Sequence, residues 1–212
     1  MRNVKWSSVE AVAEGEFKKL EPGAYVASIV KVVDVPEKEY VQVLYDIAEG
    51  PHKGFFSDAF YADKAWAHSI VMSYKDTALG MLKGRMETIQ KCNQGFDPFA
   101  AWDAGRLDMF AGRRVGIVLR QEEYWDKKTE EFKLGSAKCY RLCTIDDVAS
   151  GKLSNPEPKM LDDAGKREAL KRAGYFDSNI EEIMRNHGVK SQSAAPASVQ
   201  SRDVYDDDIP FA

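Results

Sequence analysis

Aromatic and basic side chains alternate along one short polar stretch of the chain, between residues 124 and 133. Flat rings can stack on nucleic-acid bases, and ammonium groups can pair with the phosphates between them. This combination suits a single strand, whose bases are accessible. The candidate binding residues of this stretch are Tyr124, Trp125, Lys127, Lys128, Phe132 and Lys133. A hairpin whose rings stack on one another across its two strands would explain the same pattern.

Three further candidates come from stretches in which apolar residues alternate with other residues, as they do in half-buried strands. Tyr40 is out of phase with the apolar residues of 41–47, so we expect it to face outward. Arg114 and Arg120 are likewise out of phase with the apolar residues of the strand that we expect at 113–120. Solvated surface arginines would fit that pattern equally well.

A ring-rich stretch at 55–61 is expected to form another strand, with aromatic residues on both of its faces. Phe55 and Tyr61 share one face, and Phe56 and Phe60 share the other. One pair must belong to the core. We choose Phe56 and Phe60 as the exposed pair, because Asp58 shares their phase and an exposed face tolerates a carboxylate better.

The chain ends in an acidic run followed by a small apolar segment. The preceding residues 191–202 are small and polar and include a proline, so they cannot bury enough apolar surface to offset the entropy of ordering. An aromatic residue at the end of such a tail serves no purpose in folding and points to a partner that binds it. The six candidate docking residues are Asp206, Asp207, Asp208, Ile209, Pro210 and Phe211.

The sequence nominates no catalytic or metal site. It contains neither a Walker-type phosphate loop nor a nucleophile-elbow motif. Cys139 and Cys143 share one face of a predicted strand, but two thiols without a nearby histidine make a poor zinc site. We expect buried free cysteines, no cofactor and no enzymatic activity.

The predicted elements must place these candidates on one fold. Three strands, one helix and two more strands in this order are typical of the five-stranded OB-fold barrel. A β-sandwich would require seven or more strands. The helix is expected at 74–93, and the strands are expected at 24–35, 40–47, 55–61, 113–120 and 134–145.

The remaining residues divide the chain into three parts. Residues 1–150 are expected to form the barrel domain, and residues 151–190 a connector and a helical pair that packs on itself or against the barrel. Residues 191–212 are expected to form a disordered linker with the acidic tip. Trp6, Trp66 and Trp102 lie outside the expected binding strands, so we interpret them as core or dimer contacts.

Charge is distributed unevenly along a chain of 212 residues with a net charge of −4. The last 22 residues hold four Asp and one Arg, whereas residues 113–141 hold eight basic and five acidic residues. No apolar run is long enough to cross a membrane, and no signal peptide is evident. Three cysteines do not form a disulfide framework, so the cytoplasm is the expected compartment.

The tip closely resembles that of bacterial and phage single-stranded DNA-binding proteins, which runs Asp-Asp-Asp-Ile-Pro-Phe after a disordered linker. The order of elements in the body is similar to that of the phage-type members. In that family the tip docks into basic-rimmed apolar pockets on replication and repair enzymes. Here Ala212 follows Phe211 and displaces the terminal carboxylate, which contributes to docking in the family.

The resemblance implies a non-enzymatic, sequence-non-specific single-stranded DNA-binding protein of phage replication or recombination, acting in the host cytoplasm. Its barrel would coat the strand, and its tip would recruit partner enzymes. A protein-interaction adaptor that never touches DNA and uses the tip to occupy host docking pockets is the alternative. An annealing recombinase is a third possibility, for which the sequence contains no specific feature. The sequence leaves the oligomeric state open, with a homo-oligomer among the options.

Overall fold

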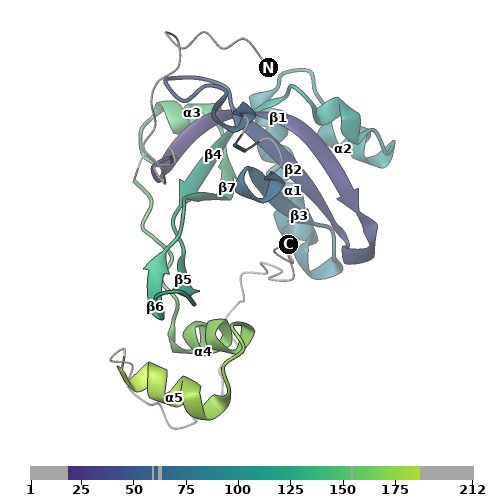
Figure 1. Cartoon of the computed structure of the whole chain (residues 1–212). Helices are drawn as coiled ribbons and strands as arrows, with labels where there is room; N and C mark the ends of the chain where they lie inside the picture. Colours follow the sequence, from purple (N-terminus) through teal and green to yellow (C-terminus); the bar gives the residue numbers. More distant parts are fainter. Residues whose placement is uncertain (1–18, 59, 62–63, 154, 187–212) are drawn as a thin grey trace, which may run out of the picture.

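The computed structural model describes residues 19–58, 60–61, 64–153 and 155–186. The fold is mainly β, with an OB-like antiparallel barrel of five strands and several helical additions (Figure 1). The strands are hydrogen-bonded in the order β3-β2-β1-β4-β7, and β3 approaches β7 so that the barrel nearly closes. Their bounds are β1 Gly23–Val35, β2 Tyr40–Ile47, β3 Ser69–Ser73, β4 Arg114–Arg120 and β7 Lys138–Cys143.

The long strand β1 holds the barrel together because it pairs with two neighbours. Its first half pairs with β4, from Gly23 opposite Leu119 to Ser28 opposite Arg114. Its second half pairs with β2, and the register shifts between Ile29 and Lys31. Such a bulge bends a strand and increases its twist, which a small barrel requires.

Alternation along the strands fills the barrel interior, as the sequence predicts. The predicted bounds of β2 are confirmed, and its residues 41, 43, 45 and 47 are all buried. The three apolar residues of β4 in the predicted inward phase are also buried. The helix α1 (Leu79–Cys92) follows β3, as expected for this fold, and contributes Leu82, Met86 and Ile89 to the same core.

Short helices cover the rest of the barrel. Asp97 caps α2 (Pro98–Asp103) by accepting hydrogen bonds from the N–H groups of Phe99 and Ala100. Thr144 begins α3 (Ile145–Ala149) with a capping box that it shares with Asp147. The single-turn helices are η2 Pro36–Lys38, η3 Phe55–Ser57, η4 Ala65–Ala67, η5 Asp76–Ala78 and η6 Leu107–Phe110.

The expectation of a third strand at 55–61 is wrong. Residues 55–57 form η3, and the third strand is β3 at 69–73. Gly54 precedes η3 with φ of 74°, in the left-handed region that only glycine adopts at no steric cost, and so turns the chain out of the sheet. The aromatic content that favours a strand here serves instead to pack this loop onto the barrel.

The chain between β4 and β7 forms a hairpin that projects from the barrel (Figure 1). We call this hairpin, β5 (Glu123–Asp126) and β6 (Glu131–Leu134), the arm. Two antiparallel helices, α4 (Asp163–Arg172) and α5 (Asp177–Asn186), pack on it. The arm and both helices together are called the lobe.

The lobe has its own hydrophobic core, separate from that of the barrel. Trp125 of the arm, Leu170 of α4, and Ile180 and Met184 of α5 are all buried in it. The helical pair was expected to pack either on itself or against the barrel. It packs on itself and on the arm.

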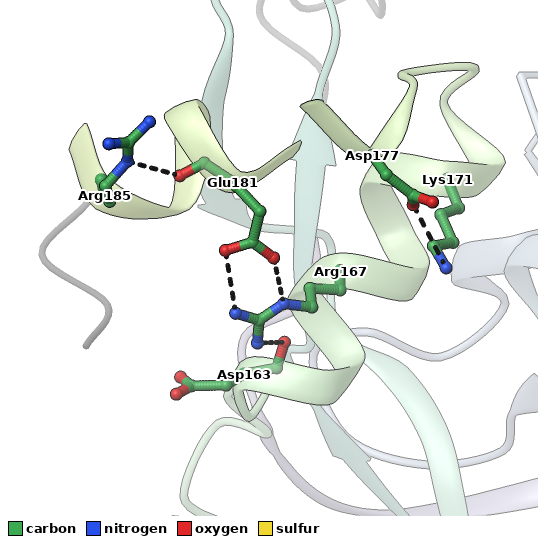
Figure 2. Close-up of polar contacts among 6 residues, drawn as sticks. All are labelled: Asp163, Arg167, Lys171, Asp177, Glu181 and Arg185. Carbon is green, nitrogen blue, oxygen red and sulfur yellow. Dashed lines mark hydrogen bonds and ion pairs between the residues drawn. The ribbon is translucent and has the colours of Figure 1, made fainter. Parts of the chain in front are cut away.

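Polar contacts fasten the two helices of the lobe to each other (Figure 2). The Arg167 guanidinium donates to both carboxylate oxygens of Glu181, at 3.0 and 3.4 Å. Lys171 lies 3.4 Å from the carboxylate of Asp177, where α5 begins. This pairing of charges lowers the pKa of Glu181 below its usual value, chiefly through the hydrogen bond from Arg167.

The connector from the barrel to α4 returns along the arm. The Lys159 N–H donates to the Gln121 carbonyl, and the Glu123 N–H donates to the Lys159 carbonyl. The Leu161 N–H donates to the Glu123 carboxylate. The root of the arm is thus held by three chain segments. Among the described residues, no helix has the length and apolar character needed to cross a membrane.

Candidate nucleic-acid interface

The basic residues of the 113–141 region belong mainly to the barrel edge and not to the arm. Residues 113–120 and 136–143, which include β4 and β7, hold five basic residues and no acidic ones. In the intervening residues 121–135 the acidic residues outnumber the basic ones. Basic residues of the 113–141 region are thus in excess at the β4–β7 edge, where Glu49 and Glu122 pair with Arg114 and Arg120.

Rings and cations alternate across this edge. The Arg120 guanidinium carbon lies 4.1 Å from the centroid of the Tyr140 ring. Lys138 is the cross-strand neighbour of Arg120, and its ammonium lies 5.7 Å from the centroid of the Trp66 ring. Trp66 is in η4, directly before β3, where the barrel nearly closes. We call Trp66, Lys138, Tyr140 and Arg120 the ring–cation strip.

The exposed member of the ring–cation strip is Trp66, which has 47% of its surface accessible. Of the two expectations for Trp66, a core or a dimer contact, this exposure excludes the core. An indole with one exposed face and an ammonium group beside it can take a stacked base and the phosphate next to that base. Arg120 also pairs with Glu122 at 3.2 Å, which fixes its guanidinium against Tyr140.

A second ring–cation pair lies on the same loop between β2 and β3. The Lys64 ammonium is 3.2 Å from the centroid of the Phe60 ring and donates to the Phe60 carbonyl at 2.8 Å. Phe60 is exposed, as expected, although it lies in a loop and not in a strand. This loop thus presents two exposed rings, Phe60 and Trp66, each with a lysine beside it.

A buried carboxylate holds this loop on the barrel. Asp46, at the end of β2, accepts hydrogen bonds from the Phe56 N–H at 2.9 Å and from the Ser57 hydroxyl. The Phe56 ring stacks on His68 at 5.2 Å and meets Tyr45 edge to face at 5.6 Å. These contacts fix residues 56 and 57 against the end of β2.

Two of the predicted strand residues are buried. Phe56 has 6% of its surface accessible and anchors the loop described above, so the choice of this residue for an exposed face is wrong. Tyr40 has 9% accessible, and the expectation that it faces solvent is also wrong. Tyr40 pairs with Val35 of β1 on one side and with Ser73 of β3 on the other.

The arm also differs from the expectation. Trp125 and Phe132 are cross-strand partners with ring centroids 4.8 Å apart, and Trp125 is 7% accessible beneath the helices. Lys166 of α4 lies 5.0 Å from the centroid of the Phe132 ring. The alternative interpretation, rings stacked on one another across a hairpin, describes these two residues. The exposed ring of the arm is Tyr124, with 46% accessible.

The lysines of the arm fall into two groups. Lys127 and Lys128 are exposed at the turn of the hairpin. Lys133 is 3.0 Å from the Asp126 carboxylate and 3.8 Å from that of Glu131. The hydrogen bond from Lys133, together with the Lys128 N–H and the Thr129 hydroxyl, lowers the pKa of Asp126 to about 2. The charge of Lys133 is therefore largely compensated within the arm.

Arg114 points outward as predicted and forms an ion pair with Glu49. The predicted cysteines of β7 are buried, and burial raises the pKa of Cys139 to about 12 and that of Cys143 to about 11. Both thiols therefore stay protonated at neutral pH. Within the described ranges, no three His, Cys, Asp or Glu residues gather closely enough to hold a metal ion. The tip residues 206–211 lie outside the described residues.

Sequence reasoning missed three members of the ring–cation strip. Lys138 and Tyr140 could have been found by the rule that selected Arg114 and Arg120, because they flank the buried Cys139 in a strand. Trp66 carries no such signal, since it lies in a single-turn helix whose exposure depends on tertiary packing. No family model matches this chain, and no curated protein is detectably similar to it.

Proposed function

We propose that this protein binds single-stranded DNA without sequence preference and serves phage DNA replication or recombination. The observation that carries the proposal is the ring–cation strip on an OB-like barrel, an exposed indole with the Lys138 ammonium beside it and the Arg120 guanidinium on the Tyr140 ring. Bases stack on Trp66, and phosphates pair with Lys138. The proposed activity makes and breaks no covalent bond. The protein covers the DNA strand and does not act as an enzyme.

Titration with oligothymidine tests this activity directly. We expect binding that quenches tryptophan fluorescence and weakens steeply as salt increases, because counterions are released when lysines neutralise phosphates. Trp66→Ala should weaken binding and remove most of the quenching. Trp102→Phe is the matched control, since Trp102 packs against Tyr74 and the barrel core and should leave both signals unchanged.

The charge of Lys138 gives a second measurement at the same site. Lys138→Gln should reduce the slope of log affinity against log salt by about 0.7, the contribution of one contact with a single strand. Lys83→Gln is the control, because Lys83 is an exposed lysine on α1 that pairs only weakly with Glu87 at 3.9 Å. Absence of oligothymidine binding at low salt would refute the proposal and favour the adaptor alternative.

The recruitment of partners is assigned to the tip. We expect removal of residues 203–212 to leave DNA binding unchanged or stronger, because the removed segment is acidic. The same truncation should abolish the capture of replication or recombination enzymes. A truncated protein that loses its DNA affinity would contradict this division between barrel and tip.

A further inference from the structure

Two strands of the barrel face each other without pairing. The hydrogen-bonded order of the sheet ends at β3 on one side and at β7 on the other, yet these two strands contact each other. Among the described strands, β3 has β2 as its hydrogen-bonded neighbour and β7 has β4. The backbone groups on the other edge of each strand therefore need partners from elsewhere. We call the boundary between β3 and β7 the seam.

The carbonyl of Val71 lies on the seam edge of β3. The Tyr45 N–H of β2 donates to the carbonyl of His68, directly before β3, so residues 45 and 68 form a hydrogen-bonded pair. Hydrogen-bonded and non-hydrogen-bonded pairs alternate along an antiparallel ladder, and Val71 opposite Gln42 is therefore a non-hydrogen-bonded pair. The Val71 carbonyl thus points away from β2 and toward the seam.

Arg85 of α1 supplies the partner for this carbonyl. The helix contacts both β3 and β7, and the Arg85 guanidinium donates to the Val71 carbonyl at 2.5 Å. Across the seam, the charge of Arg85 acts on the thiol of Cys139 in β7. Burial raises the pKa of that thiol to about 12, and the positive charge of Arg85 opposes this increase. One half-buried side chain thus interacts with both edges of the seam.

The seam separates the two groups that we propose for a base and a phosphate. Trp66 lies before β3, whereas Lys138 is the first residue of β7 and the neighbour of Cys139. The 5.7 Å between the Trp66 ring centroid and the Lys138 ammonium is therefore a distance across the seam. A hydrogen bond from a guanidinium is stronger than one between neutral groups, so the Arg85 contact is suited to hold that distance.

We propose that Arg85 is a positioning residue of the DNA site. It holds the β3 side of the seam against the β7 side, so that one nucleotide can stack on Trp66 and pair with Lys138 at the same time. This inference rests on the proposed DNA binding. Arg85 acts through the Trp66 ring and not on the DNA. A site whose two groups must act together loses binding when their spacing is loose, even though both groups remain.

A double-mutant cycle with oligothymidine separates positioning from direct contact. Arg85→Met keeps an unbranched side chain but removes the donors, and it should weaken binding about fivefold or more, the lower end of what one stacked base contributes. In the Trp66→Ala background the same change should alter the affinity by less than about twofold, because the ring to be positioned is absent. Arg85→Lys should recover most of the affinity, since an ammonium also donates to a carbonyl.

Arg106→Met is the matched control, because it removes the same charge at a distance from the seam residues in the chain. The Arg106 guanidinium donates to both carboxylate oxygens of Asp108 in η6, at 2.8 Å each. The control should bind oligothymidine within about twofold of the wild type. A loss equal to that of Arg85→Met would assign the effect to net charge and overturn the inference.

Two results of the cycle would also overturn the inference while leaving DNA binding intact. One is full affinity in Arg85→Met. The other is an equal loss from Arg85→Met with and without the Trp66 ring, because Arg85 would then contribute independently of that ring. A wild type that fails to bind oligothymidine at low salt fails at the proposed function itself, which keeps the two failures distinguishable.

Hydrogen exchange of the wild type tests the seam even if Arg85→Met does not fold. A nucleotide that contacts both Trp66 and Lys138 bridges the seam and stabilises its closed form. The amides of β3 and β7 should therefore exchange more slowly when oligothymidine is bound, whereas those of α5 should not change. Saturating oligothymidine that leaves exchange in β3 and β7 unaltered would contradict the proposal.

Discussion

The barrel and the lobe each bury apolar side chains in a core of their own, and the two cores differ greatly in size. The barrel core takes residues from all five strands and from α1 and α2. The lobe core consists of four buried residues, flanked by rings and small side chains of the arm and the helices. Since the stabilisation gained from burial grows with the area removed from water, the barrel is the stable unit and the lobe the marginal one.

The two regions also differ in how they hold charge. Ion pairs link the helices of the lobe and compensate the lysine of the arm. On the barrel edge, by contrast, cations lie against the aromatic rings of Tyr140 and Trp66. In the lobe the charges hold the two helices together, whereas Lys138 on the barrel edge is the cation that we propose for a phosphate contact.

The largest effect is expected from a cavity in the barrel core. Ile117→Ala, at a fully buried position in β4, should lower the free energy of unfolding by about 2–5 kcal/mol. Urea denaturation followed by circular dichroism measures it. Because the arm connects β4 to β7, the barrel and the lobe should lose structure together. A barrel that tolerates the change with a loss below about 1 kcal/mol would contradict its role as the stable unit.

A matched cavity in the lobe should separate the two regions. Leu170→Ala removes a fully buried side chain from a core of four, so α4 and α5 should unfold while the barrel stays folded. Hydrogen exchange should increase in the helices and stay slow in β1 and β4. Oligothymidine binding on a short strand should change by less than about twofold. Fast hydrogen exchange in β1 and β4 of the variant would show instead that the barrel and the lobe unfold together.

Removal of the exposed indole is expected to affect binding and not folding. Trp66→Ala should weaken oligothymidine binding by roughly 5-fold to 150-fold, equivalent to the 1–3 kcal/mol of one stacked base. The midpoint of urea denaturation should stay within error of the wild type, because 47% of the Trp66 surface is already accessible to water. An unchanged affinity would remove Trp66 from the binding surface.

The smallest effect concerns acid pH in the arm. The pKa of Asp126 is lowered from 3.8 to about 2 in the folded arm, so its stabilisation is fully present above about pH 4 and is lost as the pH falls toward 2. Trp125 fluorescence between pH 5 and 2 should report this loss. Asp126→Asn should remove that pH dependence of the arm. A wild type and a variant with identical acid profiles would exclude the carboxylate as its source.

The sequence predicts the barrel well because its strands carry the burial pattern themselves. In β2 the apolar phase marks the inward face without reference to any other part of the chain. In β4 the same phase supplies the barrel core, although the residues between are buried too. Gly116 shows where such local information ends. A Cβ at this position would come within 2.7 Å of the Cys143 sulfur, so β4 and β7 approach closely only because residue 116 is glycine.

The wrong predictions share one physical cause: tertiary contacts, and not the local sequence, determine which aromatic rings are buried. The sequence around Phe56 and Trp125 is typical of exposed binding rings, yet each ring is covered by another segment of the chain. Trp66 has the composition of a core residue, yet it lies exposed beside Lys138. A single sequence does not record which helix will cover which ring, so these residues could not be sorted by pattern alone.

The returning connector has a consequence for limited proteolysis. Lys152 is exposed where the chain leaves α3, and a tryptic cut there would sever the covalent path from the barrel to α4. The released fragment would nevertheless stay attached, through the Lys159 backbone bonds to the arm and through Leu170 against Trp125. The nicked protein should therefore elute as one species on a sizing column and separate into two pieces only in denaturant.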